Sequence, residues 1–137
     1  MRVTPNYRTQ AWLSALGWKA DIVERRRGPT SKDLFGLFDV VALAPDREPI
    51  SGVLGIQCTT SAHLRERIRK MLGQSALAWW LRRGNGAWAV GWKETASSRG
   101  VGSNGRRRVL WQPKIWCFGL WEDRVEVGRL LPGSEES

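Results

Sequence analysis

Residues 34–60 constrain the fold of this chain more than any other stretch. They hold two apolar runs, LFGLFDVVAL and VLGIQCTT, which are joined by the turn-rich link APDREPISG. Apolar runs of this length, flanked by proline and glycine, predict strands at residues 38–43 and 53–59 that pair as a hairpin. The two predicted strands also carry polar side chains where a buried strand usually has none, namely Asp39, Gln57 and Thr59.

The rest of the chain supplies helices and strands around this hairpin. Hydrophobic periodicity predicts helices at residues 7–16, 62–72 and 74–83, and further strands at residues 18–24, 87–92, 109–120 and 122–131. In the first helix, the predicted apolar stripe is Ala11, Trp12, Ala15 and Leu16. We expect a basic loop at residues 25–32, a flexible loop at residues 95–104, and a strand interruption at Pro113.

The order of these elements predicts an α/β fold. A helix comes first, three strands follow as an antiparallel meander, and a helical crossover then leads to a later strand. This order describes a mixed β-sheet flanked by helices. A length of 137 residues suits one domain. We therefore expect a single domain over residues 1–131 and a disordered tail over residues 132–137.

The charge balance favours a polyanionic partner. The chain has 22 lysine and arginine residues against 13 aspartate and glutamate residues, which gives a net charge of +9 and a pI near 10.8. This excess favours nucleic acid first and an anionic membrane second; a basic surface that only aids solubility is the alternative. Clustered arginines suit phosphate binding without sequence readout, and the clusters are Arg25, Arg26 and Arg27; Arg65 and Arg69; Arg82 and Arg83; and Arg106, Arg107 and Arg108.

The tryptophans, the cysteines and the lengths of the apolar runs bear on the class of ligand and on the cellular compartment. Most of the nine tryptophans fit core positions, but Trp18, Trp111 and Trp121 are less clearly inward and could stack on unpaired bases. The two cysteines have no partner at zinc-ligand spacing, which fits a reducing compartment. No apolar signal core and no run near the ~20 apolar residues of a membrane span occur, so we expect a cytoplasmic protein without a membrane partner.

Asp39 and Gln57 form a candidate site for a divalent cation. If the hairpin strands pair antiparallel, Asp39 stands near Gln57, and a carboxylate with an amide oxygen is a ligand set that magnesium accepts. Such an ion, held against a phosphodiester, activates water and stabilises the departing oxygen. The alternative role is structural, with Asp39 bonded to a backbone amide or an arginine and Gln57 satisfied by backbone partners.

The hairpin resembles the core of the PD-(D/E)XK nuclease superfamily, which includes restriction enzymes and Holliday junction resolvases. In that core a metal-binding Asp starts one strand, an (Asp/Glu)-x-Lys triplet lies on the next, and a helix follows. The matching pieces are Phe38-Asp39-Val40-Val41, Ile56-Gln57-Cys58-Thr59 and the predicted helix from residue 62. Residues 7–92 also resemble small phage and bacterial members. The resemblance implies a restriction-endonuclease-like αβββαβ core, Mg²⁺ or Mn²⁺ as the cofactor, and a bacterial or phage-infected cell.

Two positions of the triplet depart from the superfamily pattern. Gln57 stands where the acidic residue is expected, and it offers an oxygen without a charge. Thr59 stands where the lysine is expected, and it cannot act as a cation beside the attacking water. Lys32, in the basic loop, and Lys19, on the first strand, are candidates for the missing lysine.

Further residues could complete the implied site. The superfamily often adds an acidic residue from the first helix, which has none here, and Glu24 is the nearest substitute, with Asp33 a weaker one. His63 could contact the scissile phosphate or act as a general base, or could be a surface histidine in a first turn. The implied catalytic set is Glu24, Lys32, Asp39, Gln57 and Thr59, of which Glu24, Asp39 and Gln57 would bind the metal.

Three functional hypotheses remain open from the sequence. The resemblance implies a metal-dependent endonuclease that cuts double-stranded or branched DNA, as resolvases do. The lost triplet acid and lysine favour a nuclease-fold DNA-binding protein with weak or no catalysis. The third hypothesis is a phage adaptor or inhibitor that binds another protein. A resolvase would act as a symmetric homodimer. DNA would contact His63 and the arginines of the first, second and fourth clusters.

Overall fold

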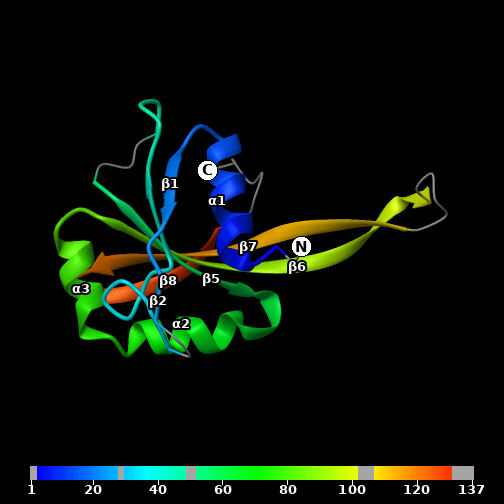
Figure 1. Cartoon of the computed structure of the whole chain (residues 1–137). Coiled ribbons are helices and arrows are strands. Elements are labelled where there is room, and N and C mark those ends of the chain that lie inside the picture. The colour runs from blue at the N-terminus through cyan, green and yellow to red at the C-terminus, as the bar shows by residue number, and fades with distance from the viewer. Residues whose placement is uncertain (1–2, 28–29, 49–51, 102–106, 131–137) are drawn as a thin grey trace.

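The computed structural model describes residues 3–27, 30–48, 52–101 and 107–130 (Figure 1). The three helices are α1 (Pro5–Ala15), α2 (Leu64–Leu72) and α3 (Ser75–Arg82), and a short 3₁₀ turn, η1 (Ser61–His63), precedes α2. The strands are β1 (Lys19–Ile22), β2 (Arg25–Arg27), β3 (Thr30–Lys32), β4 (Val40–Leu43), β5 (Leu54–Thr60), β6 (Gly86–Val101), β7 (Arg107–Trp121) and β8 (Arg124–Leu130).

Six of the strands form one mixed sheet in the order β1-β4-β5-β6-β7-β8. The strands β1, β4 and β5 pair as an antiparallel meander, β5 and β6 pair parallel, and the remaining pairs are antiparallel. Helices α2 and α3 lie on the crossover from β5 to β6. The predicted α/β class, the meander and the helical crossover are therefore confirmed.

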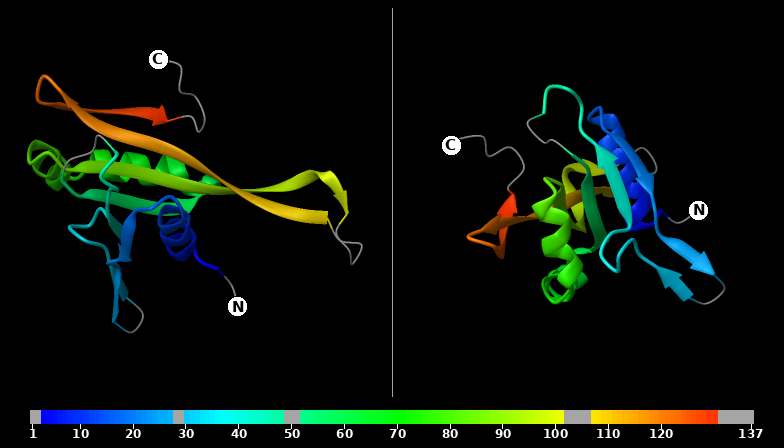
Figure 2. Two further views of the ribbon diagram at one scale, coloured as in Figure 1. Left: turned by 90° about the horizontal axis from the view of Figure 1, so that it is seen from above. Right: turned by 90° about the vertical axis from the view of Figure 1, so that its left-hand side faces the viewer.

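The helices cover both faces of the sheet (Figure 2). On one face, Leu13 of α1 packs with Val40, Ile56 and Val90. On the other face, residues of α2 and α3 pack with Phe38 and with residues of β6 and β7. Coverage of both faces explains why every residue of β5 except Thr60 is buried, since a strand with two covered faces has no exposed side. Among the described residues, no helix has the length and apolar character needed to cross a membrane.

Helix α1 buries a different face from the predicted apolar stripe. Its buried residues are Thr9 and Leu13, whereas Ala11, Ala15 and Leu16 are exposed. Thr9 can be buried because its hydroxyl donates to the carbonyl of Pro5 at 2.8 Å and accepts from the indole N–H of Trp92 at 2.9 Å. A satisfied hydroxyl costs little to bury. The predicted stripe was therefore wrong for Ala11, Ala15 and Leu16, whereas Trp12 does pack against the core.

The segment predicted to be a flexible loop is largely strand. Strand β6 runs to Val101 and pairs with β7 as a long two-stranded ribbon that projects from the sheet (Figure 1). Pro113 does not interrupt β7. It lies opposite Trp92 of β6, while the described pairing of β7 with β8 begins only at Ile115. Within the described residues, β7 pairs at Pro113 with β6 alone, and a strand edge tolerates the missing N–H of proline.

The predicted basic loop at residues 25–32 also contains strands. Strands β2 and β3 form a small antiparallel hairpin in which Arg25 pairs with Lys32. Cross-strand hydrogen bonds within the hairpin supply the order that its polar composition does not indicate. Residues 28–29, Arg106 and the predicted tail at residues 132–137 lie outside the described residues.

The tryptophans divide differently from the prediction. Trp18, which is less clearly inward from the sequence, is buried and contacts Trp88, so it is not exposed for stacking on a base. Trp111 is 37% exposed and lies under the guanidinium of Arg8, 4.0 Å from the ring centroid. Trp121 is 64% exposed, and Trp79, which the sequence did not single out, is 65% exposed.

Candidate active site

Asp39 is held firmly at the start of β4. Its backbone N–H donates to Ile56 at 2.9 Å, and its carbonyl accepts from Val23 at 2.8 Å, so it joins β1, β4 and β5. Its side chain is 3% exposed, and the carboxylate Oδ2 accepts from the backbone N–H of Cys58 at 2.9 Å. The carboxylate therefore has a fixed position at one end of the hairpin predicted from the sequence.

Two further carboxylates approach Asp39. Glu24 follows β1 and Asp33 follows β3, and one carboxylate oxygen from each of the three residues lies within 4.8 Å of the others. The β2–β3 hairpin explains this meeting. Arg25 pairs with Lys32, so the chain leaves the sheet after Glu24 and returns beside it at Asp33. Three carboxylates at this spacing offer the oxygen ligands that a hard divalent cation accepts.

The environment of Asp39 favours its protonated form. Burial is the largest cause, and together with a side-chain hydrogen bond to Asp33 and the charges of Asp33 and Glu24 it raises the pKa of Asp39 to about 8. The hydrogen bond from the Cys58 N–H acts in the opposite direction. Without a cation, these surroundings therefore favour a proton on Asp39 near neutral pH.

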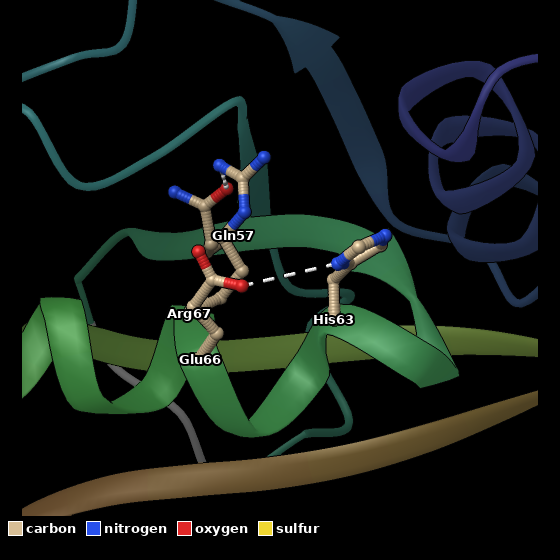
Figure 3. Close-up of polar contacts among 4 residues, drawn as sticks. All are labelled: Gln57, His63, Glu66 and Arg67. Atoms are coloured by element: carbon tan, nitrogen blue, oxygen red, sulfur yellow. Dashed lines mark hydrogen bonds and ion pairs between the residues drawn. The ribbon is translucent and has the colours of Figure 1, made fainter.

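Gln57 lies beside this cluster, but its amide oxygen faces away from the carboxylates. The register of β4 with β5, extended by one residue, brings Gln57 next to Asp39, as expected. The amide nitrogen of Gln57 donates to Asp33 at 3.2 Å and to the carbonyl of Leu37. Its oxygen accepts from Arg67 at 3.3 Å (Figure 3). In this arrangement Gln57 positions Asp33, and its oxygen, the expected metal ligand, is occupied by Arg67.

A cleft of about 520 Å³ opens beside Asp39 and Glu24. Its walls come from the N-terminal end of α1, the end of β5 and the start of α2. Thr59 lines the cleft and is buried, in the place where the superfamily has lysine. His63 and Arg67 line it as well, so two nitrogen-bearing side chains stand on the same wall.

His63 is an exposed residue, 64% accessible, whose Nδ1 lies 3.9 Å from Glu66 of α2 (Figure 3). Within the described part of the chain this is the one close contact between a basic and an acidic side chain, and it is an ion pair only when His63 is protonated. His63 is thus a surface histidine at a helix start, as the second alternative states, and it also borders the cleft. Its contact with a phosphate or its role as a general base stays a prediction.

The two candidate lysines do not enter the cleft. Lys32 is exposed at the end of β3 and is not among the described residues that line the cleft. Lys19 is at the opposite end of β1 from Glu24, about 16 Å away for five extended residues. The cation nearest to the triplet position is instead Arg67, which contacts Gln57 directly.

The predicted phosphate-binding arginines are only partly described. Arg25, Arg65 and Arg69 are exposed, as such a role requires. Arg26, Arg27, Arg107 and Arg108 lie in strands, but their side chains are outside the described ones, as is the whole of Arg106.

Sequence reasoning missed or underrated three residues of the site. Asp33 is only a weak candidate from the sequence, and Arg67 is not among the candidates. Asn6 was not considered, yet its amide donates to Glu24 at 3.3 Å. None of the three has a local pattern that marks it, because each reaches the site through the packing of a separate element.

The chain matched no protein-family model, no curated protein and no solved structure in the three comparisons made.

Proposed function

We propose that this chain is a metal-dependent endonuclease of the PD-(D/E)XK type that acts on DNA. The observation that carries the proposal is the meeting of Glu24, Asp33 and Asp39, two of which, Glu24 and Asp39, line a cleft. Arg67 and His63 line the same cleft. A cluster of oxygen ligands suits Mg²⁺ or Mn²⁺, and nitrogen-bearing side chains on the adjoining wall suit a phosphodiester.

The topology supports the same proposal. The resemblance implies a core of one helix, three strands, a helix and a strand. The chain has α1, the meander β1-β4-β5, the crossover α2–α3 and the parallel strand β6 in that order. The candidate metal ligand Asp39 immediately precedes the second strand of the meander, and Gln57 and Thr59 lie on the third.

Residues of the cleft and of the adjoining carboxylate cluster would have different roles in phosphodiester hydrolysis. Water adds to phosphorus, one P–O bond breaks, and the departing oxygen gains a proton. Glu24, Asp33 and Asp39 would hold the cation, which supplies acidity to water and charge neutralisation to the phosphate. Arg67 would bind a phosphate oxygen, and Gln57 would keep Asp33 in place.

A nuclease-fold DNA-binding protein with little catalysis is the second candidate. Two observations favour it. Thr59 provides no positive charge at the lysine position, and Arg67 occupies the oxygen of Gln57 instead of leaving it for a metal. Such a protein would keep the basic surface and the salt-sensitive affinity for DNA without cleavage.

Cleavage of supercoiled, linear, single-stranded and four-way-junction DNA, with Mg²⁺ and with Mn²⁺, tests the proposal. We expect nicking or cutting by the wild type, and Asp39→Asn should reduce the rate by about two orders of magnitude or more, because the buried ligand is lost. Asp46→Asn is the matched control, since Asp46 is exposed in the connection that follows β4.

Each other outcome identifies a different hypothesis. No cleavage with either metal, together with retained salt-sensitive binding, would replace the nuclease by the DNA-binding protein. Equal cleavage by wild type and Asp39→Asn would point to a contaminating nuclease and remove the support for this site. Neither cleavage nor binding would favour the protein-binding adaptor.

A further inference from the structure

Phe35 combines strain with exposure. It lies at the tip of a tight loop in which Leu34 and Phe38 bridge each other, and its φ is +57°. A bulky residue is uncommon in the left-handed region, because its side chain makes that backbone conformation strained. Burial does not offset this strain, because the Phe35 side chain is 60% exposed. An apolar ring held out in a strained conformation indicates a binding role.

Phe35 borders an aromatic pocket, a space of about 500 Å³ lined by Phe35, Ser75, Ala76, Trp79, Trp80, Arg83 and Asn85. Trp80 forms an inner wall, with its centroid 6.3 Å from Phe35 and 4.7 Å from the buried Phe38. The indole N–H of Trp80 is already used by the carbonyl of Gly86. Trp79, on the same helix, is 65% exposed. Two solvent-facing rings thus border a third that is fixed.

The single positive charge among the residues that line the pocket indicates which class of ligand it would bind. Arg83 is the one charged residue among those that line it, and no acidic side chain is among the described lining residues. A ligand that fits must present a flat apolar surface together with a negative charge. A nucleotide has both, because its base stacks on aromatic rings and its phosphate pairs with a guanidinium. The net charge of +9 favours the same class of partner.

We propose that the aromatic pocket binds an unpaired base of a nucleic acid, stacked against Phe35 and Trp79 with its phosphate at Arg83. This proposal rests on the proposed function, for which it names a preferred substrate: DNA with a bulge, a branch or another unpaired base. Phe35 follows Asp33 by two residues, so their Cα atoms are at most about 7 Å apart. A base in the pocket is therefore held next to the loop that brings Asp33 to the carboxylate cluster.

Binding without metal tests the proposal independently of cleavage. Fluorescence anisotropy in EDTA compares a continuous DNA duplex with the same duplex carrying one unpaired 2-aminopurine. We expect the wild type to prefer the bulged duplex by about 5- to 100-fold, the range that corresponds to one base stacked on an aromatic side chain. Trp79→Ala should remove the preference and leave the affinity for the continuous duplex unchanged.

Two further variants separate stacking from folding. Phe35→Asn removes the ring and keeps a residue that tolerates the left-handed conformation, so its fold should persist while the preference falls. Trp121→Ala is the matched control, because Trp121 is 64% exposed, like Trp79, but belongs to the end of β7 and not to the pocket lining. Its preference should equal that of the wild type. Stacking should also change the 2-aminopurine emission only while Phe35 and Trp79 are present.

Several results would overturn the proposal. Equal affinity of the wild type for both duplexes, or equal losses in Trp79→Ala and Trp121→Ala, would refute a base-binding pocket while leaving DNA binding intact. A Trp79→Ala variant that changes the sedimentation of the protein instead of its DNA preference would assign the pocket to self-association. Failure to bind either duplex would refute the proposed function itself, and with it this proposal.

Discussion

Asp39 is both almost wholly buried and close to two other carboxylates. Each condition alone disfavours an ionised side chain, since burial removes water and neighbouring negative charges repel. Two sets of hydrogen bonds keep the carboxylate in place. The backbone of Asp39 is bonded to its neighbouring strands, and the carboxylate accepts from the backbone N–H of Cys58. In the absence of a cation, the buried Asp39 therefore lowers the free energy of unfolding. A residue with such a cost is expected where it is needed for function, for example as a metal ligand.

Metal affinity should therefore rise with pH. In the folded chain the pKa of Asp39 is raised from 3.8 to about 8, so the group holds a proton between these values, and a cation must displace it. We expect the affinity for Mn²⁺ to increase up to about tenfold per pH unit below pH of about 8 and to level off above it. Titration calorimetry across this range measures the slope.

The variant Asp39→Asn provides the control for this titration. It should bind Mn²⁺ more weakly and should lose most of the pH dependence that the displaced proton causes. A wild-type affinity that stays constant from acid to neutral pH would show that Asp39 does not exchange its proton for the metal.

Residues of the site could be predicted where a pattern in the neighbouring sequence marks them, and could not where they reach the site through tertiary packing. Asp39 and its position near Gln57 follow from the hairpin pattern, and Glu24 follows from the end of the first strand. Asp33 reaches the cluster only through the unpredicted β2–β3 hairpin. Arg67 reaches it through the packing of α2 against β5, which no spacing in the sequence reveals.

Strands that depend on a partner were the elements that the sequence predicted least well. The composition of residues 95–104 is small and polar, and β6 continues through much of it because β7 pairs alongside. The meander and crossover were predicted because apolar runs and turn residues mark them within the chain. The composition of residues 95–104 describes that segment alone, whereas the β6–β7 ribbon depends on both of its strands.

The contact between Gly55 of β5 and Phe38 shows how closely the elements pack. A Cβ on Gly55 would lie 2.6 Å from the ring of Phe38, which is fully buried and packs against Trp80. We expect Gly55→Ala to lower the free energy of unfolding by about 1–3 kcal/mol, because the ring has no room to move. Urea denaturation followed by tryptophan fluorescence measures the change.

Gly128→Ala in β8 is the matched control for this substitution. A Cβ there meets nothing within 4 Å, and the position is also in a strand. Its stability should stay within about 0.5 kcal/mol of the wild type. Equal stability of the two variants would mean that the ring of Phe38 can shift to make room for a Cβ on Gly55.

At the scale of the whole molecule, the positive charge is spread over exposed side chains. Arg65, Arg69 and Lys70 are exposed on α2, the helix that also supplies Arg67 to the cleft. Long basic side chains in water bind phosphates by releasing counterions, and the affinity then depends on salt more than on sequence. A basic helix beside the carboxylate cluster would therefore guide DNA toward the cleft.

The salt dependence of DNA binding should show how many of these side chains contact phosphates. We expect the double variant Arg65→Gln/Arg69→Gln to flatten the slope of log K against log[salt] by about two units, since each phosphate contact contributes roughly one. Anisotropy titrations at several salt concentrations provide the slope. Glu66→Gln, at an 81% exposed position on the same helix, should act in the opposite direction and strengthen binding. An unchanged slope in the double variant would place the DNA elsewhere.

The burial of Cys58 has a kinetic consequence. Its thiol is 6% exposed with a raised pKa, and its backbone N–H is the donor to Asp39. A thiol reagent can reach the sulfur only when β5 separates from its surroundings, so the alkylation rate of Cys58 reports how often the site opens. A ligand that holds the carboxylates together should slow this reaction, and the half-buried Cys117 provides an internal reference in the same molecule.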